Sequence, residues 1–337
     1  MWLPLVQSIT HDAARDASYL RGMGKTKSER HHWWPECVSE RWADEDGGVH
    51  WLLPSGEERR ARPESFGVIG NGHFIKLGNK PGEPTPWDQN FETVFHQADA
   101  GFPAVINWLE GLTFEARPGQ PRRSRFLPQP SSDDNFGQMV ESLASLAIRS
   151  PMTREACVGI AERFRGPLPE WERNSLIAMN MRDMHARAVQ AFGVRGKATA
   201  ILSPDREFVF GDGFYHNLTS PSGPPHAPNI LAPLTPRLAV LYARPMQYTV
   251  EPRLSTLVIA ADEAEALNRV VQICARDKLF YRSDRPDVTE EYRAAKHLQF
   301  SSPGHLVEEM IHGMPGVPDR DTSLDFLGQF GRRQGRS

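Results

Sequence analysis

Between residues 49 and 75, apolar and polar residues occur in short runs that turn-forming residues separate. The run "VHWLL" is followed by "PSGEE" and, further along, by "FGVIGNGHFIKL". Short runs of β-forming residues bounded by Gly, Pro and Asp predict antiparallel strands joined by tight turns. Six apolar side chains are expected to fill the interior of this element: Trp42, Trp51, Leu53, Phe66, Ile69 and Phe74.

From residue 88 to residue 193 the apolar positions recur every three or four residues, which is the helical period. The first expected helix begins at Asp88 as N-cap and ends near Leu109, with a kink or break at Gly101-Phe102-Pro103. Three further helices are then expected, over residues 135–150, 153–166 (with Thr153 as N-cap) and 169–193.

From Lys197 onward the period returns to two. Four runs predict strands, over residues 197–203, 207–212, 238–243 and 255–260. One amphipathic helix that begins at Asp262 follows, then a last strand near residues 278–283 and a helical patch near residues 304–313.

Strands, then helices, then strands again predict an α+β fold and not an alternating α/β sheet. The expected architecture has short N-terminal antiparallel strands, a helical middle, and C-terminal antiparallel strands with one helix. We expect one domain over residues 28–283, a polar extension over residues 1–27, and a partly loose C-terminal extension over residues 284–337.

The formal charge of −3 gives no basic surplus of the kind that nucleic-acid-binding proteins usually carry. The basic run Arg117–Arg125 and the closing "GRRQGRS" are expected to be a solvated loop and a tail. Three widely spaced cysteines favour a reducing compartment over a disulfide framework. The N-terminus has no signal-peptide pattern, and no stretch reaches membrane-spanning length, so a cytoplasmic protein is expected.

His31 and His32 are the first candidates for chemistry. Histidine titrates near neutral pH and is the commonest metal ligand. In an extended segment the two rings point to opposite faces, so at most one of them would serve a given site. In the alternative interpretation one histidine bonds a backbone carbonyl while Trp33 and Trp34 fill the core.

Glu92, His96 and Asp99 are spaced by four and three residues, which places them on one face of a helix. Two carboxylates and an imidazole on one stripe would hold a divalent metal ion or perform acid–base catalysis. The alternative is an ordinary solvated helix face.

Asp212 lies in "FVFGDGFYHN", where a strand ends in a Gly-Asp-Gly turn. An acid at such a turn is a common position for a functional carboxylate, although it also commonly bonds its own turn. Arg149, at the end of the helix over residues 135–150, is expected to be a buried guanidinium paired with one of these acids.

These residues stand in stretches that resemble a bacterial family catalogued as domain of unknown function 4238. "ERHHWWPECVSERWADEDGGVHWLL" resembles the family's opening His-His-x-x-Pro segment, "LAIRSP" its Arg-Thr/Ser-Pro helix end, and "NILAPLTPRLAVLYA" its Pro-Leu-Ser/Thr-Pro strand. The likeness spans residues 28–283 and marks eight positions: His31, His32, Pro35, Glu92, Arg149, Asp212, Pro233 and Pro236.

At the Asp turn this chain departs from the family pattern, because Gly211 and Phe214 stand where the family has serine and proline. The family has no assigned activity, and the resemblance implies only that some members are associated with bacterial anti-phage loci.

The leading hypothesis is a cytosolic, nuclease-like hydrolase that acts on nucleic acid or a nucleotide. Glu92 and Asp212 would hold a divalent metal ion, with His96 and Asp99 as further candidate ligands. His31 or His32 would act as general base, and Arg149 would bind a phosphate.

The alternative hypothesis is a non-catalytic sensor or interaction module that binds a protein partner or a second copy of itself. The same residues would then be structural, with Arg149 and Asp212 forming a buried pair. The missing basic surplus favours this alternative.

Overall fold

The centre of the protein is a five-stranded mixed sheet with the strand order β10-β11-β8-β12-β7. The computed structural model describes residues 30–32, 34–63, 68–70, 74–75, 89–90, 93–218, 228–294 and 304–318. The five strands are β7 (Leu127–Gln129), β8 (Lys197–Leu202), β10 (Asn229–Thr235), β11 (Leu238–Ala243) and β12 (Leu254–Val258). Strands β8 and β12 run parallel, and the other neighbours run antiparallel.

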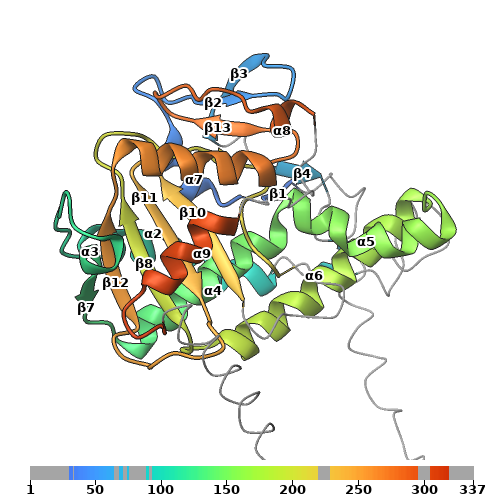
Figure 1. Cartoon of the computed structure of the whole chain (residues 1–337). Coiled ribbons are helices and arrows are strands. Elements are labelled where there is room, and N and C mark those ends of the chain that lie inside the picture. Colours follow the sequence, from blue (N-terminus) through green and yellow to red (C-terminus); the bar gives the residue numbers. More distant parts are fainter. Residues whose placement is uncertain are drawn as a thin grey trace, which may run out of the picture.

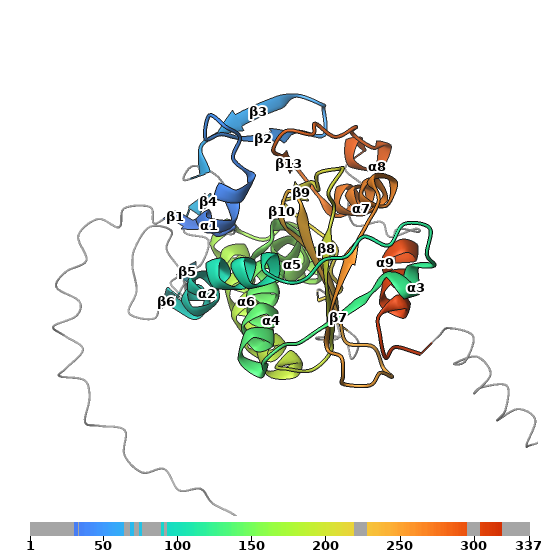
Figure 2. The ribbon, with the colours of Figure 1, turned by 90° about the vertical axis from the view of Figure 1, so that its left-hand side faces the viewer.

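Helices cover both faces of this sheet, which Figure 2 shows edge-on. One face carries α2 (Thr93–Glu110), α4 (Asp133–Arg149) and α6 (Glu170–Phe192), and the other carries α7 (Ala261–Cys274) and α9 (Gly304–Gly313). Helix α5 (Pro151–Arg165) pairs with α6, and this α5–α6 hairpin projects from the body in Figure 1. Two short helices, α3 (Arg122–Arg125) and α8 (Glu290–Arg293), lie near α9 and α7 respectively.

A second sheet has the order β3-β2-β13-β9 and is antiparallel throughout. Its strands are β2 (Val49–Leu52), β3 (Glu58–Ala61), β9 (Phe210–Gly211) and β13 (Leu279–Tyr281). Two further pairs join β1 (Arg30–His32) to β4 (Val68–Gly70) and β5 (Phe74–Ile75) to β6 (Gln89–Asn90). Helix α1 (Glu36–Ser39) and the 3₁₀ turn η2 (Glu40–Trp42) connect β1 to β2.

The α+β prediction is confirmed, but the N- and C-terminal strands do not form separate layers. Strand β13, from the end of the chain, lies between β2 and β9 in one sheet. Strand β7 lies in a proline-rich stretch, where no alternation of apolar and polar residues predicts a strand. Its Pro128 is compatible with a strand because β7 is an edge strand, where a missing N–H need not break a ladder.

Trp34 anchors the N-terminal stretch to the second sheet. Its side chain is fully buried and stacks on Phe210 of β9, with 4.0 Å between ring centroids. Phe280 of β13 lies 5.2 Å away, and Trp42 is 6.1 Å away. Trp34 is therefore fixed by aromatic packing across two strands, whereas Trp33, expected beside it in the core, lies outside the described residues.

Other residues expected inside the N-terminal element differ in burial. Trp42 is fully buried, whereas Trp51 and Leu53 are half-buried. Phe66 and the side chains of Ile69 and Phe74 lie outside the described part of the chain.

Helix α2 is continuous through Pro103, so the expected break is absent. Proline cannot donate the helical hydrogen bond to the carbonyl four residues earlier, which is that of Asp99. The thiol of Cys37 lies 4.0 Å from this oxygen and donates to it instead. The thiol of Cys37 in α1 thus partly replaces the hydrogen bond that Pro103 cannot donate. Asp88, the expected N-cap, lies outside the described residues.

Two helix starts differ from the prediction. Helix α5 begins at Pro151, and the Ser150 side chain caps it by accepting from the Thr153 N–H at 3.3 Å, so Thr153 is not the N-cap. Helix α7 begins at Ala261, and the Glu263 carboxylate accepts from the Ala260 N–H. Both helices thus begin before the expected cap. In α5 the start is favoured by a serine at the N-cap and a proline at the first helical position. In α7 it is favoured by a glutamate at the third helical position.

The C-terminal residues that the structure describes pack against the body. Tyr292 of α8 is fully buried and donates to the carbonyl of Leu52 in β2 at 2.7 Å. Helix α9 buries Val307, Met310 and Ile311. Among the described residues, no helix is both long and apolar enough to cross a membrane.

Two glycines let the chain after β9 pass close to the end of α7. A Cβ on Gly211 would lie 2.7 Å from the Cβ of Ala275, and a Cβ on Gly213 would collide with the carbonyl oxygen of Cys274. The Gly-Asp-Gly sequence is therefore a requirement of close backbone approach. The opposite case is Gly159 in α5, where an added Cβ meets nothing within 4 Å.

We predict that alanine has opposite effects at these two kinds of glycine. Gly213→Ala should lower the free energy of unfolding by about 1–3 kcal/mol, because the collision forces the backbone apart. Gly159→Ala should raise it by up to about 1 kcal/mol, because alanine favours the helix interior. Urea unfolding followed by circular dichroism measures both. Equal effects of the two substitutions would contradict the described packing.

Candidate functional site

Arg149, at the end of α4, forms a two-pronged ion pair with Asp99 of α2. Its Nη1 lies 3.0 Å from Oδ2 of Asp99, and its Nη2 lies 2.5 Å from Oδ1. The Arg149 side chain is 1% exposed and that of Asp99 is 31% exposed, so the pair reaches from the interior to the surface. The guanidinium also lies 4.8 Å above the ring of Phe95. A cation in the last turn of a helix is favourable as well.

His185 of α6 contacts the same phenylalanine. Its ring is 4.9 Å from that of Phe95, and the residue is 4% exposed. Burial, and then the charge of Arg149, lowers the pKa of His185 to about 4. Its Nε2 atom is buried and has no hydrogen-bond partner among the described residues.

His96 and Cys37 lie on the outer side of the group that Arg149, Asp99, Phe95 and His185 form. His96 is exposed on α2, one turn before Asp99. Cys37 is half-buried, and burial, followed by the charges of Asp99 and Glu40, raises the pKa of its thiol to about 11. Cys37 is therefore a protonated thiol at neutral pH and a poor nucleophile. All three cysteines of the chain are free.

Asp212 has a different environment from Asp99. It is 3% exposed, and its two oxygens accept from the backbone N–H groups of Arg276 and Asp277 at 2.7 and 2.9 Å. Burial raises the pKa of Asp212 to about 6, against the effect of these N–H groups, which lower it. The carboxylate thus holds the turn between α7 and β13 in place.

Polar contacts continue from this turn to the α5–α6 hairpin. The Arg276 side chain lies 2.6 Å from Glu155 of α5, which in turn lies 2.7 Å from Arg173 of α6. On the same side, the hydroxyl of Thr153 lies 3.4 Å from Nε2 of His216, a fully buried histidine four residues after Asp212. The acid of the Gly-Asp-Gly turn is therefore connected to the base of the hairpin.

The structure brings together only part of the residue set that the sequence predicts. Asp99 and Arg149 are paired, and His96 is near them on α2. Asp212 instead accepts hydrogen bonds from backbone N–H groups of the turn between α7 and β13. The expected Arg149–Asp212 pair is wrong, since the oxygens of Asp212 are bonded to backbone. Glu92 and the side chains of His31 and His32 lie outside the described residues. Within the described ranges, no three His, Cys, Asp or Glu side chains are grouped as a metal site requires.

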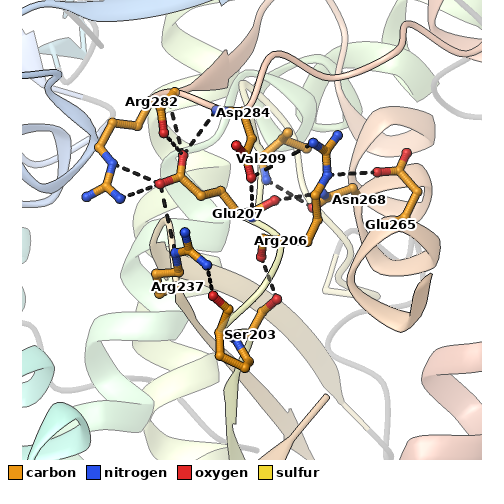
Figure 3. Close-up of polar contacts among 11 residues, drawn as sticks. Ser203, Arg206, Glu207, Val209, Arg237, Glu265, Asn268, Arg282 and Asp284 are labelled. Carbon is orange, nitrogen blue, oxygen red and sulfur yellow. Dashed lines mark hydrogen bonds and ion pairs between the residues drawn. The ribbon is translucent and has the colours of Figure 1, made fainter. Parts of the chain in front are cut away.

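Glu207 is the centre of a polar cluster that sequence reasoning missed (Figure 3). Its side chain is 1% exposed and accepts from Arg282 Nε at 3.0 Å, and from the N–H and hydroxyl of Ser283 at 3.0 and 2.8 Å. Burial alone would raise the pKa of Glu207, but hydrogen bonds from Ser283, Arg282 and Asp284 outweigh it and lower the pKa. The Glu207 carboxylate thus fixes the loop after β13.

The cluster in Figure 3 also ties α7 to the strand region. Asn268 of α7 accepts from the Val209 N–H at 2.9 Å and donates to the Glu207 carbonyl at 2.9 Å. The one signal for Glu207 in the sequence is an acid beside the apolar run "FVF". Its partners lie more than seventy residues away in the chain, so no local pattern points to them.

The basic run Arg117–Arg125 is engaged in contacts within the protein. Arg122 pairs with Glu309 of α9 at 2.6 Å, and Arg125 pairs with Glu263 of α7 at 2.6 Å. Arg123 donates to the carbonyl of Val317 at 3.0 Å. These arginines connect α7 and α9, and the acids that face them reduce the positive charge that a nucleic-acid backbone would meet.

Compared with models of protein families, with curated proteins and with solved structures, the chain matches none. The resemblance to domain of unknown function 4238 therefore stays a prediction.

We predict that acid lowers stability through the buried histidines. The pKa of His185 is about 4 and burial lowers that of His216 to about 3, against 6.5 when unfolded, so the unfolded chain binds more protons below pH 6.5. The free energy of unfolding should therefore fall as the pH drops from 6.5 toward 4. Asp212 opposes this fall, because its pKa is raised from 3.8 to about 6 on folding.

Urea unfolding at a series of pH values measures this dependence. In Asp212→Asn the loss of stability on acidification should be steeper than in the wild type, because the opposing group is gone. A free energy of unfolding that stays constant between pH 6.5 and 4.5 would contradict the role of the two buried histidines.

A second prediction concerns Glu207. In Glu207→Gln an amide N–H₂ must face the donors of Arg282 or Ser283, so we expect a loss of about 3 kcal/mol in unfolding free energy. Glu265→Gln is the matched control, because Glu265 pairs with Arg206 at 28% exposure and should cost under about 1 kcal/mol. Thermal and urea unfolding report both changes, and similar losses in the two variants would contradict the central role of Glu207.

Proposed function

We propose that this chain is a non-catalytic protein-interaction module in which the predicted motif residues hold the α5–α6 hairpin in a fixed direction. One observation carries the proposal. The buried carboxylate of Asp212 holds the backbone at Arg276 and Asp277, and the Arg276 side chain then pairs with Glu155 at the base of α5. A residue that looked like a catalytic acid in the sequence has the contacts of a structural support.

Contacts at the junction of α4 and α5 support the same proposal. Arg149 ends α4 and bonds Asp99, and the next residue, Ser150, caps α5. The hydroxyl of Thr153 bonds the carbonyl of Ala147 at 2.7 Å, which closes the turn. The Arg-Ser-Pro sequence thus sets the angle at which the hairpin leaves the body (Figure 1).

The described residues do not fit a divalent metal ion. Both oxygens of Asp212 accept from backbone in a buried environment, and Asp99 is taken by Arg149. Glu92, the remaining acid of the metal hypothesis, lies outside the described residues.

The second candidate function is the nuclease-like hydrolase acting on nucleic acid or a nucleotide, with a role in anti-phage defence. The exposed His96 and the partly exposed Asp99, with Arg149 behind them, favour it. In that function His96 would exchange a proton with the substrate, and Arg149 would orient Asp99.

Two measurements on the same variants distinguish the functions. For the interaction module we expect no hydrolysis of single-stranded DNA, double-stranded DNA, RNA or nucleotides with Mg²⁺ or Mn²⁺. Asp212→Asn should lower the melting temperature by several degrees, because one backbone N–H then faces an amide donor.

His96→Ala is the control, because this exposed side chain has no structural contact to lose among the described residues, and its melting temperature should stay unchanged. Hydrolysis by the wild type that disappears in His96→Ala or Asp99→Asn would overturn the interaction-module proposal in favour of the hydrolase.

A further inference from the structure

The outer face of α5 exposes two large apolar side chains. Ile160 is 50% exposed and Phe164 is 83% exposed, and the two residues lie one helical turn apart. The side of α5 that packs on α6 is marked by other residues, since Glu162 pairs there with Arg173. The hairpin projects from the body in Figure 1, so a second molecule can reach the outer face.

Gly159 is exposed on the same face. An added Cβ there would meet nothing within 4 Å, so packing within the described chain does not require glycine. Glycine also weakens the interior of a helix. Beside two exposed apolar side chains, a position without a Cβ lets the backbone of a second helix approach closely.

The charge of the hairpin changes from its outer end to its base. Arg163, near the outer end, is exposed and forms no ion pair with any residue of the described ranges. At the base, three carboxylates share two ion-paired guanidinium groups, those of Glu155, Glu162 and Asp277 with those of Arg173 and Arg276. The outer end of one hairpin therefore complements the base of another in charge.

We propose that the outer face of α5 binds the same face of a second copy of this chain, with the two helices antiparallel. A two-fold axis near Ile160 brings this side chain against its own counterpart, and Phe164 against the turn that begins at Ala156 of the second copy. On the other flank of the contact, Arg163 lies near Glu155 of the second copy. A parallel arrangement would bring the two Arg163 side chains together, which is unfavourable.

This inference rests on the proposed function, and it names the partner of the interaction module. One helix from each copy makes a small interface, so we expect a dissociation constant in the micromolar range. The two proposals fail separately. Hydrolysis by the purified chain bears on the function, whereas a chain that stays monomeric at high concentration bears on the partner.

Sedimentation equilibrium of the full chain, from about 1 to about 300 µM, tests the inference. The mean mass should rise with concentration from that of one chain toward that of two. Ile160→Asp and Phe164→Asp should each weaken the dimer at least about 10-fold, because a charge replaces an apolar side chain at the contact.

Met246→Asp is the matched control. Met246 is 88% exposed on the loop between β11 and β12, so its substitution should leave the dimer unchanged. All three variants change exposed side chains, so their melting temperatures at the lowest concentration should equal that of the wild type. That result shows that altered folding is not the cause of a weaker dimer.

Photo-crosslinking tests the antiparallel arrangement. With p-benzoyl-phenylalanine in place of Phe164, copies labelled with ¹⁴N and ¹⁵N are mixed and irradiated. Trypsin cleaves after Arg154 and Arg163, so an antiparallel contact should join position 164 of one copy to the peptide Glu155–Arg163 of the other. Only a crosslink between a light and a heavy chain reports this contact, since neighbours along the same helix also lie within reach.

A mean mass of one chain at every concentration would overturn the inference. A dimer that Ile160→Asp and Phe164→Asp leave intact would overturn it as well, and so would a light–heavy crosslink to any other peptide.

Discussion

The buried carboxylate of Asp212 is the interaction on which the arrangement of the described structure most depends. It lies where the strand β9, the end of α7 and the start of β13 meet, and its oxygens bind two backbone N–H groups. Glycines on both sides allow that close meeting. Because the turn fixes Arg276, the same carboxylate also sets the position of Glu155 and with it the hairpin.

Two of the most deeply buried described charges, Arg149 and Glu207, are each matched by an oppositely charged partner. Arg149 is matched by Asp99, and Glu207 by Arg282 together with the N–H groups of the loop after β13. Removing a charge from water costs more than its attraction returns unless hydrogen bonds complete the site. These buried charges are compensated and support the fold.

The sequence predicted local features well and distant contacts poorly. The helical periods of α2, α4, α6 and α7 and the strands β8, β11 and β12 follow from burial patterns within a few residues of each other. Arg149 was expected to pair with an acid, but its partner Asp99 is separated from it by 50 residues. The backbone N–H groups that donate to Asp212 are 64 and 65 residues away, and the groups that donate to Glu207 from Arg282 and Ser283 are 75 and 76 residues away. Such pairs depend on how the sheets assemble, which periodicity does not encode.

Strand β13 has a consequence for how the chain reaches its native state. Leu279 pairs with Leu52 of β2 on one side and with Gly211 of β9 on the other. Strand β13, an inner strand of that sheet, is therefore synthesised long after its neighbour β2. Until β13 is synthesised, the edge of β2 opposite β3 has no strand to pair with, and Trp34 lacks its contact with Phe280. Such long separation between paired strands slows folding, and one edge of β2 stays unpaired until β13 has been synthesised.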